Sequence, residues 1–87
     1  MLRITNSLLP DGTHRVELAG TLAGPWLDEV RRILEEALVR SPRVVLEMRT
    51  VSFVSPDGAT LVQEFRSRGV DLGATSPFVA ELLGRQE

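Results

Sequence analysis

Cysteine is absent from this sequence of 87 residues, which excludes disulfide bonds and thiolate metal sites. Aromatic residues make up only 5% of it, so the core must be built from Leu, Val, Ile and Ala. No apolar run approaches the roughly 20 residues that span a bilayer, and no basic segment followed by an apolar one marks a secretory signal. The formal net charge of −2 gives no general attraction for nucleic acid. We therefore expect a soluble, cytoplasmic protein.

A chain of this length cannot support two hydrophobic cores, so one domain should cover residues 1–87. The tetrad Pro10-Asp11-Gly12-Thr13 is typical of a tight turn. Apolar and polar residues alternate on both sides of it, which predicts a hairpin formed by residues 2–9 and 14–20. A loop over residues 20–24 then leads to Pro25, which suits the first turn of a helix.

Helical and strand patterns alternate along the rest of the chain. Apolar side chains recur at helical spacing over residues 26–40, and again from the turn at Asp57 to Gly69. The short segments 44–48 and 70–74 predict buried strands. The inward positions expected in the two helices are Leu27, Val30, Ile33, Leu34, Ala37 and Leu38, and then Ala59, Leu61, Val62 and Phe65. A last helix begins at Ser76-Pro77 and contains Phe78, Val79, Leu82 and Leu83.

The resulting order, β-β-α-β-α-β-α, predicts an α/β fold. Its sheet should be small and mixed, mainly parallel, with an antiparallel N-terminal edge strand. Right-handed crossovers between neighbouring strands place the helices mainly on one face. The loops that follow the parallel strands then share one edge of the sheet, where such folds usually bind their ligands. These loops are residues 21–25, 50–57 and 75–77.

The most informative stretch is residues 44–65, an apolar strand that passes through Ser-Pro-Asp-Gly into an amphipathic helix. Ser55 suits the N-cap and Pro56 the first helical position, which places Asp57 in the first turn. A carboxylate there is stabilised by the helix dipole by about 0.3–1 kcal/mol. A role in starting the helix explains the presence of Asp57 as well as a role in binding a partner does.

Four features follow one another along the chain: Gly20-Thr21-Leu22 before a helix, the strand VVLEM, Val51-Ser52-Phe53-Val54, and a turn that ends in Gly58. In order and spacing, these motifs resemble the STAS domain, the family of bacterial anti-sigma-factor antagonists. The likeness covers nearly the whole chain, although the family's last strand and helix are missing. It implies a STAS-like fold and a role in signalling and transcription regulation. In the family, a kinase-like anti-sigma factor phosphorylates the serine before that glycine, and the unphosphorylated form binds this kinase and frees the sigma factor.

Two positions depart from the family pattern. Asp57 occupies the phosphorylation site, where no serine kinase can act, and Ala23 replaces the acidic residue of the first loop. A phosphoserine carries a charge of about −1.5 to −2 at neutral pH, so aspartate is a partial and permanent mimic of it. The resemblance therefore implies docking without a phosphorylation switch. The candidate partner-binding residues are Ser55, Pro56, Asp57, Gly58 and Thr60, with Thr21, Leu22, Ala23 and Gly24 along the edge of the first loop.

No enzyme and no cofactor are expected from this sequence. His14, the only histidine, should lie in an edge strand beside the first turn, without the second His or Cys that a metal site requires. The dinucleotide and phosphate-loop motifs are both absent. The expected partner is a protein, either an anti-sigma factor or a kinase-like regulator. We expect no nucleic-acid partner and no direct insertion into a membrane.

Several alternatives stay open at this stage. The chain could be the soluble STAS subunit of a membrane transport ATPase, or a small-molecule or nucleotide sensor that uses the same loop edge. Ser52 and Ser55 are alternative phosphorylation sites, and Trp26 is either a packing residue or an anchor for a partner. The basic residues of the helices are interpreted as ordinary surface charge. A homodimer is a further alternative, because a second copy would compensate for the missing last helix, which leaves a small sheet incompletely covered.

Overall fold

The computed structural model describes residues 1–84, with the side chains of Phe78, Leu82 and Leu83 outside that description. Its elements, in chain order, are β1 (Leu2–Leu8), β2 (Thr13–Leu22), α1 (Trp26–Arg40), β3 (Arg43–Val54), α2 (Pro56–Ser67), β4 (Asp71–Thr75) and α3 (Pro77–Gly84). The sheet order is β1-β2-β3-β4. β1 is antiparallel to β2 and the other pairs are parallel, so the predicted fold class is confirmed.

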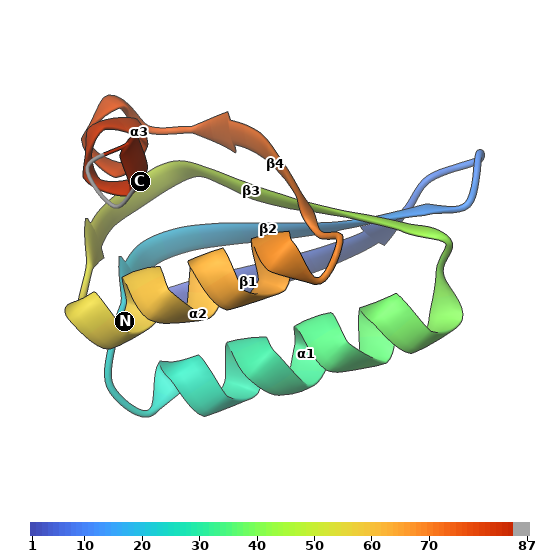
Figure 1. Ribbon diagram of the computed structural model, residues 1–87, viewed down its shortest axis with the longest axis horizontal. Helices are drawn as coiled ribbons and strands as arrows, with labels where there is room; N and C mark the ends of the chain where they lie inside the picture. The colour runs from blue at the N-terminus through green and yellow to red at the C-terminus, as the bar shows by residue number, and fades with distance from the viewer. Residues whose placement is uncertain (85–87) are drawn as a thin grey trace.

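Helices α1 and α2 lie side by side on one face of the sheet, while α3 lies apart from them beyond the carboxyl end of β4 (Figure 1). The N-terminus lies at the same end of the molecule as the start of α2. The loops that follow β2, β3 and β4 meet at this end, because all three strands run in the same direction. The hairpin between β1 and β2 lies at the opposite end.

The core lies between the sheet and the two side-by-side helices. The inward positions predicted for α2 are all buried, and those of α1 are buried or packed partly buried against the core. They meet the alternating side chains of the two central strands, which are Val16, Leu18, Val44, Leu46 and Met48. The helical periodicity of the sequence therefore identified the packing faces correctly.

Two strands are longer than the sequence predicted. β2 continues to Leu22 and β3 to Val54, so residues 20–22 and 50–54 belong to strands and not to loops. The pairing shifts register after Glu17 and again after Gly20, whose φ of +105° breaks the regular pleat. These irregularities interrupt the alternation of apolar residues, although backbone pairing continues. His14 also differs from the prediction, because β2 is paired on both sides and is no edge strand.

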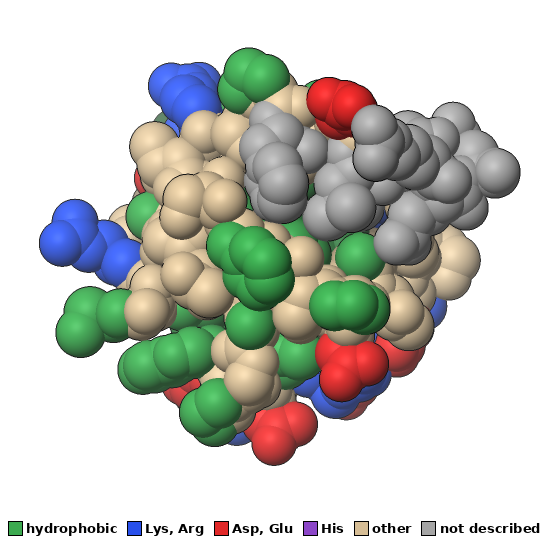
Figure 2. All heavy atoms as spheres, turned by 90° about the vertical axis from the view of Figure 1, so that its left-hand side faces the viewer, with side chains coloured by type: hydrophobic (Ala, Val, Ile, Leu, Met, Phe, Trp, Pro, Cys, Tyr) green, Lys and Arg blue, Asp and Glu red, His purple; other side chains and the backbone are tan. Residues whose placement is uncertain are grey.

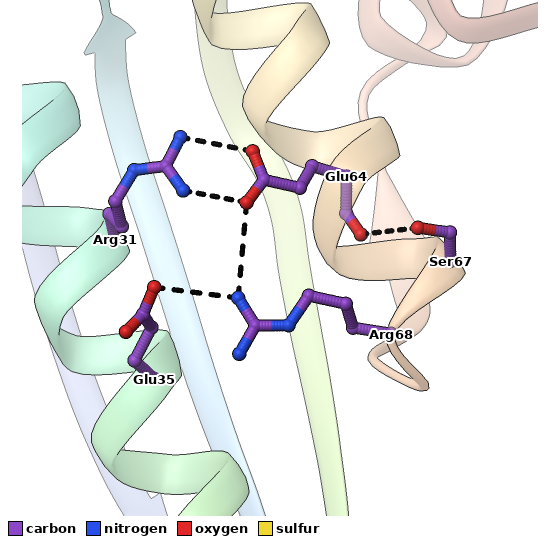
Figure 3. A network of polar contacts seen from close by, with 5 residues as sticks. All are labelled: Arg31, Glu35, Glu64, Ser67 and Arg68. Atoms are coloured by element: carbon purple, nitrogen blue, oxygen red, sulfur yellow. Dashed lines mark hydrogen bonds and ion pairs between the residues drawn. The ribbon is translucent and has the colours of Figure 1, made fainter.

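Charged side chains join α1 to α2 (Figure 3). Arg31 forms a bidentate pair with Glu64 at 2.7 and 3.0 Å, and Arg68 approaches Glu35 at 3.4 Å and Glu64 at 3.8 Å. The guanidinium carbons of Arg31 and Arg68 also lie 5.7 and 4.7 Å from the ring centre of Phe65. The interpretation of these two arginines as ordinary surface charge is therefore incomplete, since they fix one helix against the other.

The Arg31 pair makes acid stability depend on Glu64. The hydrogen bond from Arg31 holds the pKa of the Glu64 carboxyl below its usual value of 4.5. Between the lowered pKa and 4.5 the folded protein binds fewer protons than the unfolded chain, so the stabilisation is complete above pH 4.5 and is lost as the pH falls through the folded pKa. Urea unfolding at a series of acidic pH values should show that the free energy of unfolding falls less with decreasing pH for Arg31→Gln than for the unaltered protein. Identical declines would contradict this role, and high salt should reduce the difference because the pair is partly exposed.

Candidate functional site

The corner (residues 55–58) has the helix start that the sequence predicted. Ser55 is the N-cap of α2, with extended backbone angles of −72° and 164°, and its hydroxyl oxygen accepts a hydrogen bond from the Gly58 amide at 3.0 Å. Pro56 occupies the first turn, where its missing N–H costs nothing. Asp57 follows in the same turn with an exposed side chain. The cap therefore orders the backbone of the first turn, from which the Asp57 side chain projects at the surface.

The first loop and the corner are bound to each other through the backbone. The Ser55 amide donates to the Leu22 carbonyl oxygen at 3.0 Å. One turn into α2, the backbone of Gly58 passes so close to β2 that an added Cβ would lie 2.7 Å from the same oxygen and 3.1 Å from Val54 Cγ1. The end of β2 and the start of α2 therefore form one rigid unit.

The predicted site residues come together at this edge, but they differ in exposure. Leu22 and Gly58 are buried, so they position the backbone and present no side-chain surface. Pro56, Asp57, Thr60 and Gly24 are exposed, and Thr21, Ala23 and Ser55 are intermediate. Thr60 directs its hydroxyl to the Pro56 carbonyl oxygen at 3.1 Å, one turn back along α2.

The third loop lies at the same edge and is fixed to β3. The Ser76 hydroxyl donates to the Val51 carbonyl oxygen at 3.0 Å and accepts from the Val79 amide at 3.2 Å, which caps α3. The Ser76 amide donates to the Met48 carbonyl oxygen at 3.1 Å. Ser52, an alternative phosphorylation site, is exposed and donates its hydroxyl to the Gly20 carbonyl oxygen at 3.3 Å.

Exposed apolar side chains accompany the corner. Phe53 is 48% exposed and Trp26 39%, and both come from elements that end or begin at this edge. Figure 2 looks onto this end of the molecule, where several hydrophobic side chains lie across the middle and out to the left-hand side, with charged ones around them. No pattern in the sequence indicates that Phe53 is exposed, because the register shifts hide which face of β3 each residue occupies.

Asp57 supplies an exposed carboxylate at the corner. Within residues 1–84, no hydrogen bond or ion pair engages its carboxylate. Among these residues, no three His, Cys, Asp or Glu side chains lie close enough together to hold a metal ion. His14 lies at the hairpin end of β2, far from the corner, with its Nε2 2.9 Å from Asn6 Oδ1. None of the described helices has the length and apolar character needed to cross a membrane.

Solved structures share this fold, among them two anti-sigma-factor antagonists. The anti-sigma-factor antagonist SpoIIAA in its unphosphorylated form matches with a TM-score of 0.72 and 17% sequence identity, over 94% of this chain and 82% of that one. An anti-sigma-factor antagonist STAS domain from Rhodobacter sphaeroides matches with a TM-score of 0.59 and 17% identity, over 85% of each chain. No protein-family model and no curated protein sequence matches the chain. At this identity the likeness establishes the fold, so the predicted STAS-like architecture is confirmed.

Proposed function

We propose that this chain is a non-catalytic protein-interaction module of the anti-sigma-factor-antagonist type, which docks on a regulatory protein through the corner and α2. The observation that carries the proposal is the exposed carboxylate of Asp57 in the first turn of α2, on a rigid corner beside the exposed Phe53. Its partner would be an anti-sigma factor or another kinase-like regulator. The docking face would lie in the cytoplasm, where such regulators work.

The make-up of this edge supports a binding surface. Protein interfaces commonly have an apolar centre rich in aromatic residues and a polar rim, and a few aromatic anchors supply most of the binding energy. Phe53 and Trp26 have the size and exposure of such anchors. Asp57, whose side chain is exposed, would act as a rim charge that steers the partner and sets the salt dependence of association. Because aspartate cannot be phosphorylated as serine is, the charge at this position is permanent.

Affinity measurements with purified partner would test the proposal. The partner is to be captured by the immobilised chain from native lysate, identified as a kinase-like regulator, and then titrated against variants. Phe53→Ala and Trp26→Ala should each weaken binding about tenfold, the loss typical of an interface anchor. Asp57→Ser and Asp57→Ala should both slow association and reduce its dependence on salt, since both remove the same charge.

A matched control is available at Val39, which is 87% exposed near the end of α1. Val39→Ala removes exposed apolar surface away from the corner and should leave binding unchanged. Unchanged affinity in both Asp57 variants would show that the charge of Asp57 has no role in binding the partner. Unchanged affinity in Phe53→Ala and Trp26→Ala would place the docking surface elsewhere.

A further inference from the structure

The free edge of β1 is unusually regular. All its residues from Leu2 to Leu8 pair with β2 without a register shift, and the strand contains no proline and one charged residue, Arg3. The other edge, β4, is shorter and its pairing with β3 shifts register. Soluble proteins commonly protect edge strands with bulges, prolines, charges or short length, since an unprotected edge pairs with another strand. β1 has little of this protection.

The hydrogen-bonding groups on this edge can be assigned from the ends of the strand. The Met1 carbonyl oxygen accepts from the Thr21 amide at 3.1 Å, and the Leu9 amide donates to the Thr13 carbonyl oxygen at 2.8 Å. In an antiparallel ladder, residues directed towards the partner alternate with residues directed away from it. The odd-numbered residues of β1 therefore bond to β2. The outward N–H and C=O groups belong to Leu2, Ile4, Asn6 and Leu8.

The face of β1 that points towards the helix layer is also incompletely covered. Helix α1 packs over β2 and β3, and a groove of about 450 Å³ separates it from β1. Ile4, Asn6 and His14 form the sheet side of this groove. At the end of the strand Leu8 is 72% exposed, although it follows the same alternation as the buried Leu2. Most of the apolar side chain of Leu8 is therefore exposed to solvent.

We propose that β1 pairs with β1 of a second copy of this chain. The two strands are antiparallel and related by a two-fold axis that passes between the Thr5 residues of the two copies, so that one sheet runs through both copies. This register sets even-numbered residues opposite even-numbered ones, so the outward N–H and C=O groups of the two strands face each other. It is also the register that pairs every residue of β1. The inference concerns a surface other than the corner, so it goes beyond the proposed function.

The side chains of β1 are self-complementary in this register. Leu2 lies opposite Leu8 of the second copy, which covers the exposed leucine at each end of the seam. Ile4 lies opposite Asn6 of the second copy. On the face away from the helices, Thr5 meets its own equivalent and Arg3 meets Ser7 of the second copy, so no like charges stand opposite each other. An extended segment of another protein could use the same backbone groups, but the match of β1 to itself favours a second copy.

Cysteine cross-linking would test the register, since the chain has no cysteine of its own. Directly opposed residues of a non-hydrogen-bonded pair lie about 4.5 Å apart between Cα atoms, within the range that a disulfide bridges. Thr5→Cys should therefore form a disulfide-linked dimer under mild oxidation. Arg3→Cys alone and Ser7→Cys alone should remain uncross-linked, whereas an equimolar mixture of the two variants should cross-link.

The unmodified dimer would be followed by sedimentation equilibrium from micromolar to millimolar concentration. Leu8→Lys should weaken association about tenfold or more, because it introduces charges at the seam. The control Val39→Lys, at another exposed apolar residue away from β1, should leave association unchanged. Cross-linking of Arg3→Cys by itself to the same extent as Thr5→Cys would overturn the register. A monomer at all concentrations with no Thr5→Cys dimer would overturn the pairing, and would assign the β1 edge to another protein or to none. Neither result would affect partner binding at the corner.

Discussion

Replacing Phe65 by alanine is expected to destabilise the fold by about 3–5 kcal/mol, the usual cost of deleting a fully buried aromatic ring. Phe65 has no exposed surface and is the largest of the fully buried side chains. It also supports the two arginines that join the helices, since Arg31 and Arg68 lie over its ring. The loss would show as a lower urea midpoint with an unchanged slope. Small domains have total stabilities of about 5–15 kcal/mol, so this variant should be close to unfolding.

Phe53 provides the matched control for Phe65. It is the same residue type but 48% exposed, so Phe53→Ala should change the free energy of unfolding by no more than about 0.5 kcal/mol. Phe65→Leu, which keeps most of the buried volume, should lose less than Phe65→Ala and remain measurable if the alanine variant unfolds. Equal losses at Phe53 and Phe65 would contradict the assignment of Phe53 to a docking surface, because they would show that both rings are packed.

The difference between these two phenylalanines also shows what the sequence could predict. Phe65 lies on a helix with unbroken periodicity, and its inward direction follows from its spacing to Leu61 and Val62. Phe53 lies on a strand whose register shifts, so alternation does not reveal its face. Helical faces depend on local spacing, whereas strand faces depend on pairing with segments far away in the sequence.

The corner was largely predictable for a similar reason. The N-cap role of Ser55, the place of Pro56 and the position of Asp57 follow from residues that are adjacent in the chain. The bond from the Ser55 amide to Leu22 and the pair between Arg31 and Glu64 each join segments about thirty residues apart. No local pattern indicates such contacts. The sequence therefore predicted the turn and the start of α2 correctly, but not the long-range contacts that anchor them or the exposure of Phe53 beside them.

Gly58 is the residue for which helix propensity and packing give opposite predictions. Its φ is not in the left-handed region, so backbone conformation does not require glycine there. Within a helix, alanine is normally more favourable than glycine by about 1 kcal/mol. Here an added Cβ would lie 2.7 Å from the Leu22 carbonyl oxygen, a backbone atom that cannot rotate away. Gly58→Ala is therefore expected to push α2 away from β2 and to destabilise the protein by about 1–3 kcal/mol.

The same shift should weaken partner binding, because the hydrogen bond from the Ser55 amide to Leu22 holds the corner in place. Urea unfolding and partner titration would measure the two effects on one variant. Gly24→Asn is the control, since Gly24 lies in the neighbouring loop with a φ of +64° and open space around it, which asparagine tolerates. Gly24→Asn should change the free energy of unfolding little, and Val39→Ala, away from the corner, serves as the control for partner binding. A Gly58→Ala protein more stable by about 1 kcal/mol, as propensity alone demands, would show that the contact between α2 and β2 yields readily. The rigidity of the corner, on which the docking proposal depends, would then have to be abandoned.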